Sequence, residues 1–195
     1  LMVVALSALL HLYVGMRLLP AIEPEGMWLA AAYVLLAVSA LLVPAGLLAS
    51  GFRRLRWSDQ LSWAGMLAMG LFSSLLVLTM LRDVTLLILA LIGGAGDAFD
   101  RGSAIAVPVL ALAATLAGFF NARRLARVVE VEVPIPNLPR SLHGYSIAQI
   151  SDVHIGPTIK RSYLEAIVAR VNGLKPDAIA ITGDLVDGSV KRLSA

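Results

Sequence analysis

The chain has 195 residues, of which 58% are hydrophobic and 15% are charged, and its formal net charge is +3. An ordinary soluble domain carries about 25% charged residues, so this composition is typical of a membrane protein. Cysteine is absent, which excludes disulfides and thiolate metal ligands, and the small, dispersed charge predicts no nucleic-acid-binding surface.

Four apolar stretches are long enough to cross a bilayer as helices, a crossing that takes about 20 residues. We expect these spans at 1–19, 27–50, 61–93 and 104–120, and a transmembrane domain over 1–121. The first stretch has no basic leader and no small-residue cleavage site. We therefore interpret it as a span rather than a signal peptide, and we expect that some residues precede Leu1 in the natural protein.

The third stretch contains a charged pair, Arg82 and Asp83, followed by a second apolar run. That run has about 13 residues, which is short for a separate crossing. We therefore expect one long or tilted helix, with the charged pair near a membrane interface. The alternative is a division of this stretch into two spans, which would give five in all.

His11 lies inside the first span, where an ionisable residue is a candidate for a proton relay or a ligand. The alternative is a histidine that faces the helix bundle and is hydrogen-bonded to a neighbour. We favour the second interpretation, because no other ionisable residue is clearly placed at the same depth.

Arginines are distributed unevenly between the loops. The 51–60 loop carries three of them, and Arg123, Arg124 and Arg127 follow the fourth span. By the positive-inside rule both basic segments face the cytoplasm. We therefore expect a multi-pass protein of the inner (cytoplasmic) membrane, with the lipid bilayer as a partner and its polar part, 122–195, in the cytoplasm.

The polar part alternates strand and helix patterns. Residues 127–135 alternate Val with Glu and predict a half-exposed strand. The stretches 145–151 and 177–182 predict more buried strands, and the amphipathic stretch 161–176 between them predicts a helix. This strand–helix–strand order predicts a parallel pair of strands joined by a right-handed crossover.

Polar residues follow the two buried strands at the points where they end. The first strand leads into Asp152-Val153-His154, and the second leads into Gly183-Asp184, with Asp187 three residues later. Ligands of parallel sheets gather beyond these ends, and neighbouring strands lie about 4.8 Å apart. We therefore expect Asp152 and Asp184 side by side. His154 should point the same way as Asp152, because side chains alternate in an extended segment.

Two carboxylates held this close repel each other unless a positive charge lies between them, and a divalent cation would supply it. Carboxylate and imidazole ligands favour Mn, Fe or Zn. We predict Asp152, His154 and Asp184 as metal ligands, Asp187 as a supporting hydrogen-bond acceptor and Gly183 as a point of close backbone approach. Asp and Gly are also ordinary turn residues, but their joint placement after two consecutive strands favours the metal site.

Three further residues near these motifs are weaker candidates. His143 lies in a proline-rich loop, where we expect a surface histidine. Lys160 and Arg161 open the helix after the first motif and could contact a substrate phosphate. A solvated start of a helix is the more ordinary interpretation of both.

Taken together, the stretches IAQISDVHIGP and VNGLKPDAIAITGDLVDG resemble the calcineurin-like metallophosphoesterases, specifically the membrane-anchored bacterial branch with several N-terminal spans. The resemblance covers residues 143–190. It implies an α/β/β/α sandwich and a centre of two divalent ions, in which Asp152 and His154 bind the first ion, Asp184 bridges both and Asp187 supports them. It also implies hydrolysis of a phosphoester by an activated water. A lipid-linked substrate, such as a nucleotide–lipid pyrophosphate of the lipid A pathway, is one option.

The family pattern continues with a G-N-H-[DE] segment, a further His and a G-H-x-H segment, and no His follows His154 in this sequence. We therefore expect the chain to be the N-terminal part of a longer enzyme and to be inactive alone. The alternative is a non-catalytic integral membrane protein whose polar tail binds a metal or a partner. A transporter or sensor is disfavoured, because the spans carry few ionisable residues.

Overall fold

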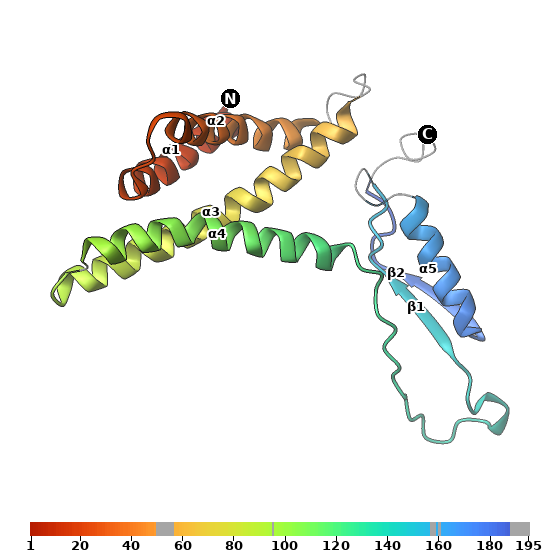
Figure 1. Ribbon diagram of the computed structural model, residues 1–195. Coiled ribbons are helices and arrows are strands. Elements are labelled where there is room, and N and C mark those ends of the chain that lie inside the picture. The colour runs from red at the N-terminus through yellow and green to blue at the C-terminus, as the bar shows by residue number, and fades with distance from the viewer. Residues whose placement is uncertain (50–56, 95, 157–158, 160, 188–195) are drawn as a thin grey trace. The chain divides into compact units, whose positions relative to one another are not determined.

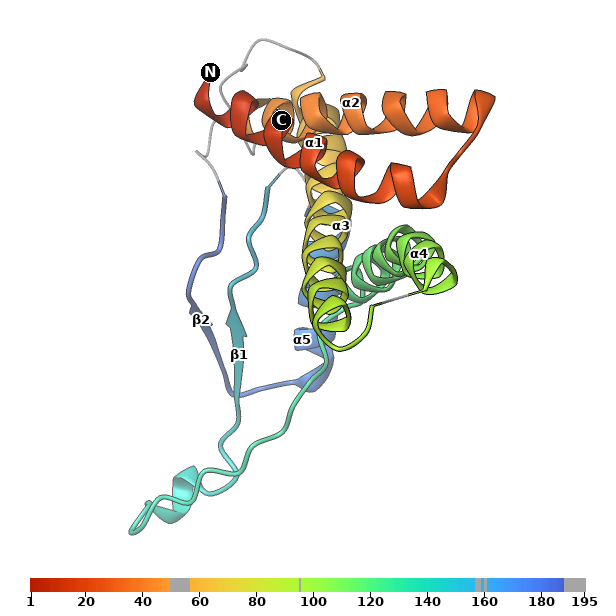
Figure 2. The same cartoon turned by 90° about the vertical axis from the view of Figure 1, so that its left-hand side faces the viewer.

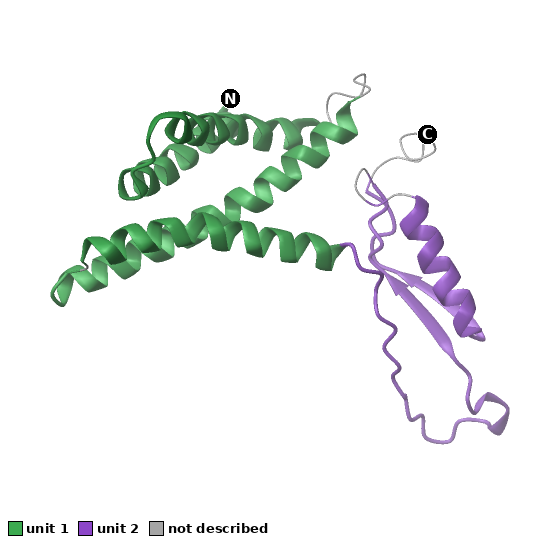
Figure 3. Ribbon diagram, in the orientation of Figure 1, with its two compact units in different colours: residues 1–122 green, residues 123–195 purple. Residues whose placement is uncertain are grey.

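The computed structural model describes residues 1–49, 57–94, 96–156, 159 and 161–187. The chain divides into two compact units, 1–122 and 123–195 (Figure 3). The first is helical and the second contains a small sheet. This order confirms the predicted fold class, a multi-span helical region followed by an α/β region.

Unit 1 consists of long apolar helices, labelled in Figure 1. They are α1 (Met2–Ile22), α2 (Gly26–Leu48), α3 (Ser58–Leu91) and α4 (Asp97–Ala122). Each is long and apolar enough to cross a membrane. The helix α3 is unbroken through Arg82 and Asp83, so the structure has no interruption there of the kind that two separate spans would need.

The helices of unit 1 pack through a small core and one close backbone contact. The buried core cluster comprises Val14, Leu18, Phe72, Ala104 and Val107. Gly46 of α2 lies so close to Gly65 of α3 that a Cβ atom at position 46 would be 2.5 Å from the Gly65 Cα atom. Such approaches between small residues are a common way for membrane helices to pack.

Unit 2 contains β1 (Ile147–Ser151), α5 (Arg161–Leu174) and β2 (Ala178–Thr182), preceded by a short 3-10 helix over Arg140–Leu142. The two strands pair in parallel, in a register from Ile147↔Ala178 to Ser151↔Thr182 (Figure 2). The predicted strand–helix–strand unit with parallel strands is therefore confirmed.

Two predictions for this unit were wrong. Residues 127–135 form no strand, and Val129, Val131 and Val133 are 71–78% exposed. Alternation alone does not make a strand, because a strand also needs a neighbour for its backbone groups. The strands expected to be buried are instead largely exposed, with Ile147 62% and Ile181 59% exposed. In the part of the chain that the structure describes, the sheet has only two strands, so each keeps an open edge.

Candidate metal centre

The backbone holds the two predicted motifs side by side. Beyond the strands, the Asp152 N–H donates to the Thr182 carbonyl at 3.3 Å, and the His154 N–H donates to the Asp184 carbonyl at 3.2 Å. The parallel pairing thus continues past both strand ends into the polar segments. Residues that are about thirty positions apart in the sequence therefore share one end of the sheet.

The Asp152 carboxylate has two donors. It accepts hydrogen bonds from the Ser151 hydroxyl group and, at 3.2 Å, from the backbone N–H of Asp184. Both bonds lower the pKa of Asp152 below its usual value, and the bond from Ser151 has the larger effect. The carboxylate is therefore ionised at neutral pH, which is the state that binds a cation.

Gly183 lies directly against this carboxylate. Its φ of 69° is in the left-handed region, which glycine adopts without strain. A Cβ atom at this position would overlap the Asp152 carboxylate. A glycine is therefore needed here for two reasons, its backbone conformation and the close approach.

His154 is paired with Asp187. The distance from its Nδ1 atom to the Asp187 Oδ1 atom is 2.9 Å, and both side chains are about half exposed. The hydrogen bond and then the negative charge of Asp187 raise the pKa of His154. In the neutral histidine this bond assigns the proton to Nδ1, which leaves the Nε2 lone pair available, an arrangement common in metal-binding histidines.

The segment between these residues is not extended, contrary to our expectation. Asp152 and His154 both have a φ of 52°, in the left-handed region. Asp and His adopt this region more readily than most residues other than glycine, and such positions often occur at functional sites. Alternation of side chains along a strand therefore does not fix where His154 points.

The donor types fit a divalent cation, because carboxylate oxygens with an imidazole nitrogen suit Mn, Fe or Zn. Among the described residues, however, no group of three or more His, Asp or Glu side chains is gathered closely enough to hold a metal ion. The residues therefore fit by chemistry, whereas their side chains do not converge on one point. Their assignment as ligands stays a prediction.

The weaker candidates have ordinary surroundings. His143 is exposed, and its Nε2 atom lies 3.2 Å from the Leu138 carbonyl. The Arg161 side chain is 89% exposed and donates to Glu165 at 2.8 Å. Lys160 lies outside the described residues.

His11 faces the interior of unit 1, where it is only 3% exposed. Its Nδ1 atom donates to the Ser7 carbonyl at 2.7 Å, and its Nε2 atom accepts from the Ser39 hydroxyl at 2.9 Å. Its ring also stacks on Phe72. These contacts match the interpretation that we favoured, a buried histidine bonded to its neighbours.

Sequence reasoning missed two polar features. It did not identify Ser151 as a partner of Asp152, although the two residues are adjacent. It also did not connect Arg82 and Asp83 with polar residues of other spans, although opposite charges within apolar helices were a usable signal.

Comparison with known proteins gives relatives for about half of the chain. A "Transmembrane protein with metallophosphoesterase domain" of Danio rerio is 44% identical over 93 residues, or 48% of this chain and 21% of that protein. An uncharacterized metallophosphoesterase of Campylobacter jejuni is 31% identical over 123 residues, or 61% and 32% of the two chains. The UDP-2,3-diacylglucosamine pyrophosphatase LpxG of Chlamydia trachomatis is 34% identical over 62 residues, or 32% and 19%.

The matched stretches thus span between 19% and 32% of these relatives. No family model and no solved structure matches the chain. The relatives support the metallophosphoesterase superfamily and, with the four apolar helices, a multi-pass membrane protein. They do not single out a bacterial branch, because the animal protein is more similar than the two bacterial ones.

Proposed function

We propose that the chain carries the membrane anchor and part of the metal centre of a phosphohydrolase that cleaves a phosphoester or pyrophosphate bond. The observation that carries this proposal is the placement of Asp152 and Asp184 at the carboxyl ends of adjacent parallel strands, with His154 bonded to Asp187. Similarity to proteins named metallophosphoesterase supports it.

Each residue has a distinct role in this proposal. Asp152 and His154 would hold one divalent ion, Asp184 would be shared with a second, and Asp187 would orient His154. Ions such as Mn, Fe or Zn supply activation of a water nucleophile and neutralise the charge on the phosphoryl group. Gly183 leaves room for the Asp152 carboxylate, which the Ser151 hydroxyl group helps to keep ionised.

The substrate class and the location extend the same proposal. One relative is named as a pyrophosphatase acting on UDP-2,3-diacylglucosamine, and a membrane anchor suits a lipid-linked phosphoester. We place the helices in the inner (cytoplasmic) membrane and the catalytic part in the cytoplasm, and the arginine-rich segments support this orientation.

Replacement of Asp184 by Asn in the full-length protein tests the metal centre. Because a bridging carboxylate contacts both ions, the metal content should fall from two ions toward one or none, and activity on a chromogenic phosphodiester should fall by about two orders of magnitude or more. Asp177→Asn is the matched control, since Asp177 precedes β2 at the opposite end of the sheet. Two retained metals and near-normal turnover in the Asp184→Asn protein would contradict the assignment.

Single cysteines test the orientation, because the chain has none of its own. A cysteine at Asp97 should react with a membrane-impermeant thiol reagent in intact cells, and one at Arg54 should react only after the cells are opened. The opposite pattern would reverse the topology.

The alternative is a non-catalytic membrane protein whose tail binds a metal or a partner. One observation favours it: within the described residues the donors do not assemble into a three-ligand group. A full-length protein that binds a metal stoichiometrically but hydrolyses no phosphodiester or pyrophosphate substrate would support this alternative.

A further inference from the structure

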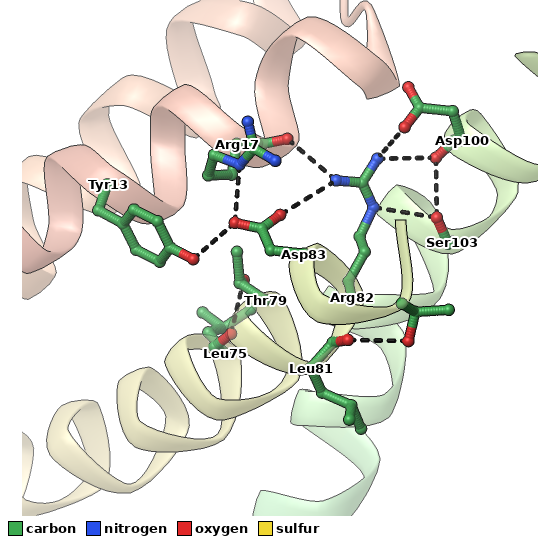
Figure 4. A network of polar contacts seen from close by, with 10 residues as sticks. Tyr13, Arg17, Leu75, Thr79, Leu81, Arg82, Asp83, Asp100 and Ser103 are labelled. Carbon is green, nitrogen blue, oxygen red and sulfur yellow. Dashed lines mark hydrogen bonds and ion pairs between the residues drawn. The ribbon is translucent and has the colours of Figure 1, made fainter. Parts of the chain in front are cut away.

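A polar network lies among α1, α3 and α4 in unit 1 (Figure 4). Its most buried member is Arg82, whose side chain is only 4% exposed. The Arg82 Nε atom donates to the Ser103 hydroxyl at 2.9 Å, Nη2 to the Asp100 carboxylate at 2.6 Å, and Nη1 to the Arg17 carbonyl at 3.4 Å. All three nitrogens of this guanidinium group therefore have acceptors within the bundle.

Arg17, unlike Arg82, has an acceptor for only one of its guanidinium nitrogens among the described residues. Its Nε atom donates to the Asp83 Oδ2 atom at 2.7 Å, and the same oxygen accepts from the Tyr13 hydroxyl at 2.6 Å. The two terminal nitrogens of Arg17 make no hydrogen bond within the part of the chain that the structure describes. The Arg17 side chain is also 46% exposed, so these nitrogens face the surroundings of the bundle.

Those surroundings are the end of a membrane span. Arg17 is five residues before the end of α1 at Ile22, which is about 7.5 Å along the helix axis. Leu12 and Met16, on the preceding turns, are 58% and 65% exposed, as lipid-facing residues are. Hydrocarbon offers no acceptor to N–H groups, and a long arginine side chain reaches from this depth to the headgroup level.

We propose that Arg17 binds the phosphate group of a phospholipid at this end of the bundle. The guanidinium fork matches two phosphate oxygens, and Asp83 and Tyr13 hold its inner edge so that less freedom is lost on binding. The four charges of Arg17, Arg82, Asp83 and Asp100 sum to zero. Recognition therefore rests on the oriented N–H groups rather than on a general positive field.

This site is separate from the proposed phosphohydrolase centre. Asp100 of the network lies in the first turn of α4. This helix is 26 residues long, and unit 2 follows its last residue in the sequence. The proposed lipid therefore binds near the end of α4 that begins at Asp97, whereas residues 123–195 follow the other end of this helix in the sequence. The inference does not depend on the proposed function.

Native mass spectrometry of the 195-residue chain in detergent tests the proposal. The wild type, Arg17→Gln and Arg101→Gln proteins are titrated with phosphatidylglycerol and with diacylglycerol of the same acyl chains, which lacks the phosphate. We expect Arg17→Gln to weaken phosphatidylglycerol binding about tenfold, because hydrogen bonds to a charged group are lost. Arg101→Gln, which removes an exposed arginine near the same end of the bundle, should change it less than about twofold.

Each other outcome overturns the proposal. Unchanged phosphatidylglycerol binding in Arg17→Gln excludes Arg17 as the site, and an equal loss in Arg101→Gln shows general charge attraction. Equal affinity for the two lipids in the wild type shows that the phosphate is not recognised. If Arg17→Gln loses its helical circular dichroism, Arg17→Lys replaces it: this variant keeps the charge but not the fork, and wild-type affinity in it would contradict recognition through the fork.

Discussion

Replacing Gly46 by Ala should weaken the packing of α2 against α3. The added Cβ atom would lie 2.5 Å from the Gly65 Cα atom, and the obstacle is backbone rather than a movable side chain. Ordinary carbon–carbon contacts are about 3.5–4.0 Å, so the two helices must separate by about 1 Å. Overpacking of this kind costs about 1–3 kcal/mol of unfolding free energy.

A matched control is available on α3 itself. A Cβ atom at Gly70 would meet nothing within 4 Å. Gly70→Ala should therefore not destabilise the protein, and it should stabilise α3 by up to about 1 kcal/mol, because alanine is favoured over glycine inside a helix. Unfolding of each variant in mixed micelles, followed by tryptophan fluorescence of unit 1, gives the two free energies.

A comparison of the unfolding free energies of these variants tests whether α2 and α3 meet through the glycine pair. Equal stability of Gly46→Ala and Gly70→Ala would show that α2 and α3 do not meet through this glycine pair. Gly65→Ala should resemble Gly46→Ala, because its Cβ atom would collide with the Gly46 backbone in turn.

Three further variants probe the charged and strained positions. Arg82→Leu should cost about 2–3 kcal/mol of unfolding free energy, less than the roughly 3–5 kcal/mol of a fully buried pair, because the Asp100 side chain is 44% exposed. Gly183→Ala should cost about 1–2 kcal/mol of conformational strain at φ 69° and speed amide exchange at the ends of both strands. Ser146 lowers the pKa of Asp177 through its N–H and hydroxyl groups, so this contribution to stability is present above about pH 4 and is lost as the pH falls through the folded-state pKa. The protection factors of the β2 amides, which take account of the pH dependence of intrinsic exchange, should therefore fall over that range in the wild type and less so in Asp177→Asn.

The sequence predicted the elements well where one physical signal dominated. Apolar runs of about 20 residues identify membrane helices without reference to tertiary structure, because the bilayer alone sets their length. The boundaries were less certain: α4 begins at Asp97 rather than at residue 104, because acidic residues are favourable in the first turn of a helix even where hydropathy is low. The strand predicted over 127–135 was wrong because a strand needs a partner strand for its backbone groups. The alternation of Val and Glu does not show whether such a partner is present.

From the sequence, the pairing of the backbone at the site could be predicted, whereas the directions of its side chains could not. Parallel pairing placed Asp152 beside Asp184, as expected from the order of the elements. The positive φ values of Asp152 and His154 could not be foreseen, because they arise where the chain turns after β1. Side-chain direction, and so ligand geometry, depends on those angles. The network around Arg82 likewise could not be predicted, because it depends on which faces of three helices contact one another. The sequence of one span does not determine those contacts.

The two polar clusters differ in charge balance, and this difference decides which of them needs a bound cation. In unit 1, Arg82 and Arg17 are matched by Asp100 and Asp83, so the charges compensate one another without a ligand. At the ends of β1 and β2, three carboxylates face at most one positive charge, that of His154 when it is protonated. An exposed site can tolerate this excess because water screens it, but any layer that covers the sheet would remove that water and raise the energetic cost of the repulsion. A covered site of this composition therefore needs either a bound cation or protonation of a carboxylate, and the imidazole beside the carboxylates favours the cation, which is the physical reason to expect metal there and not in the membrane.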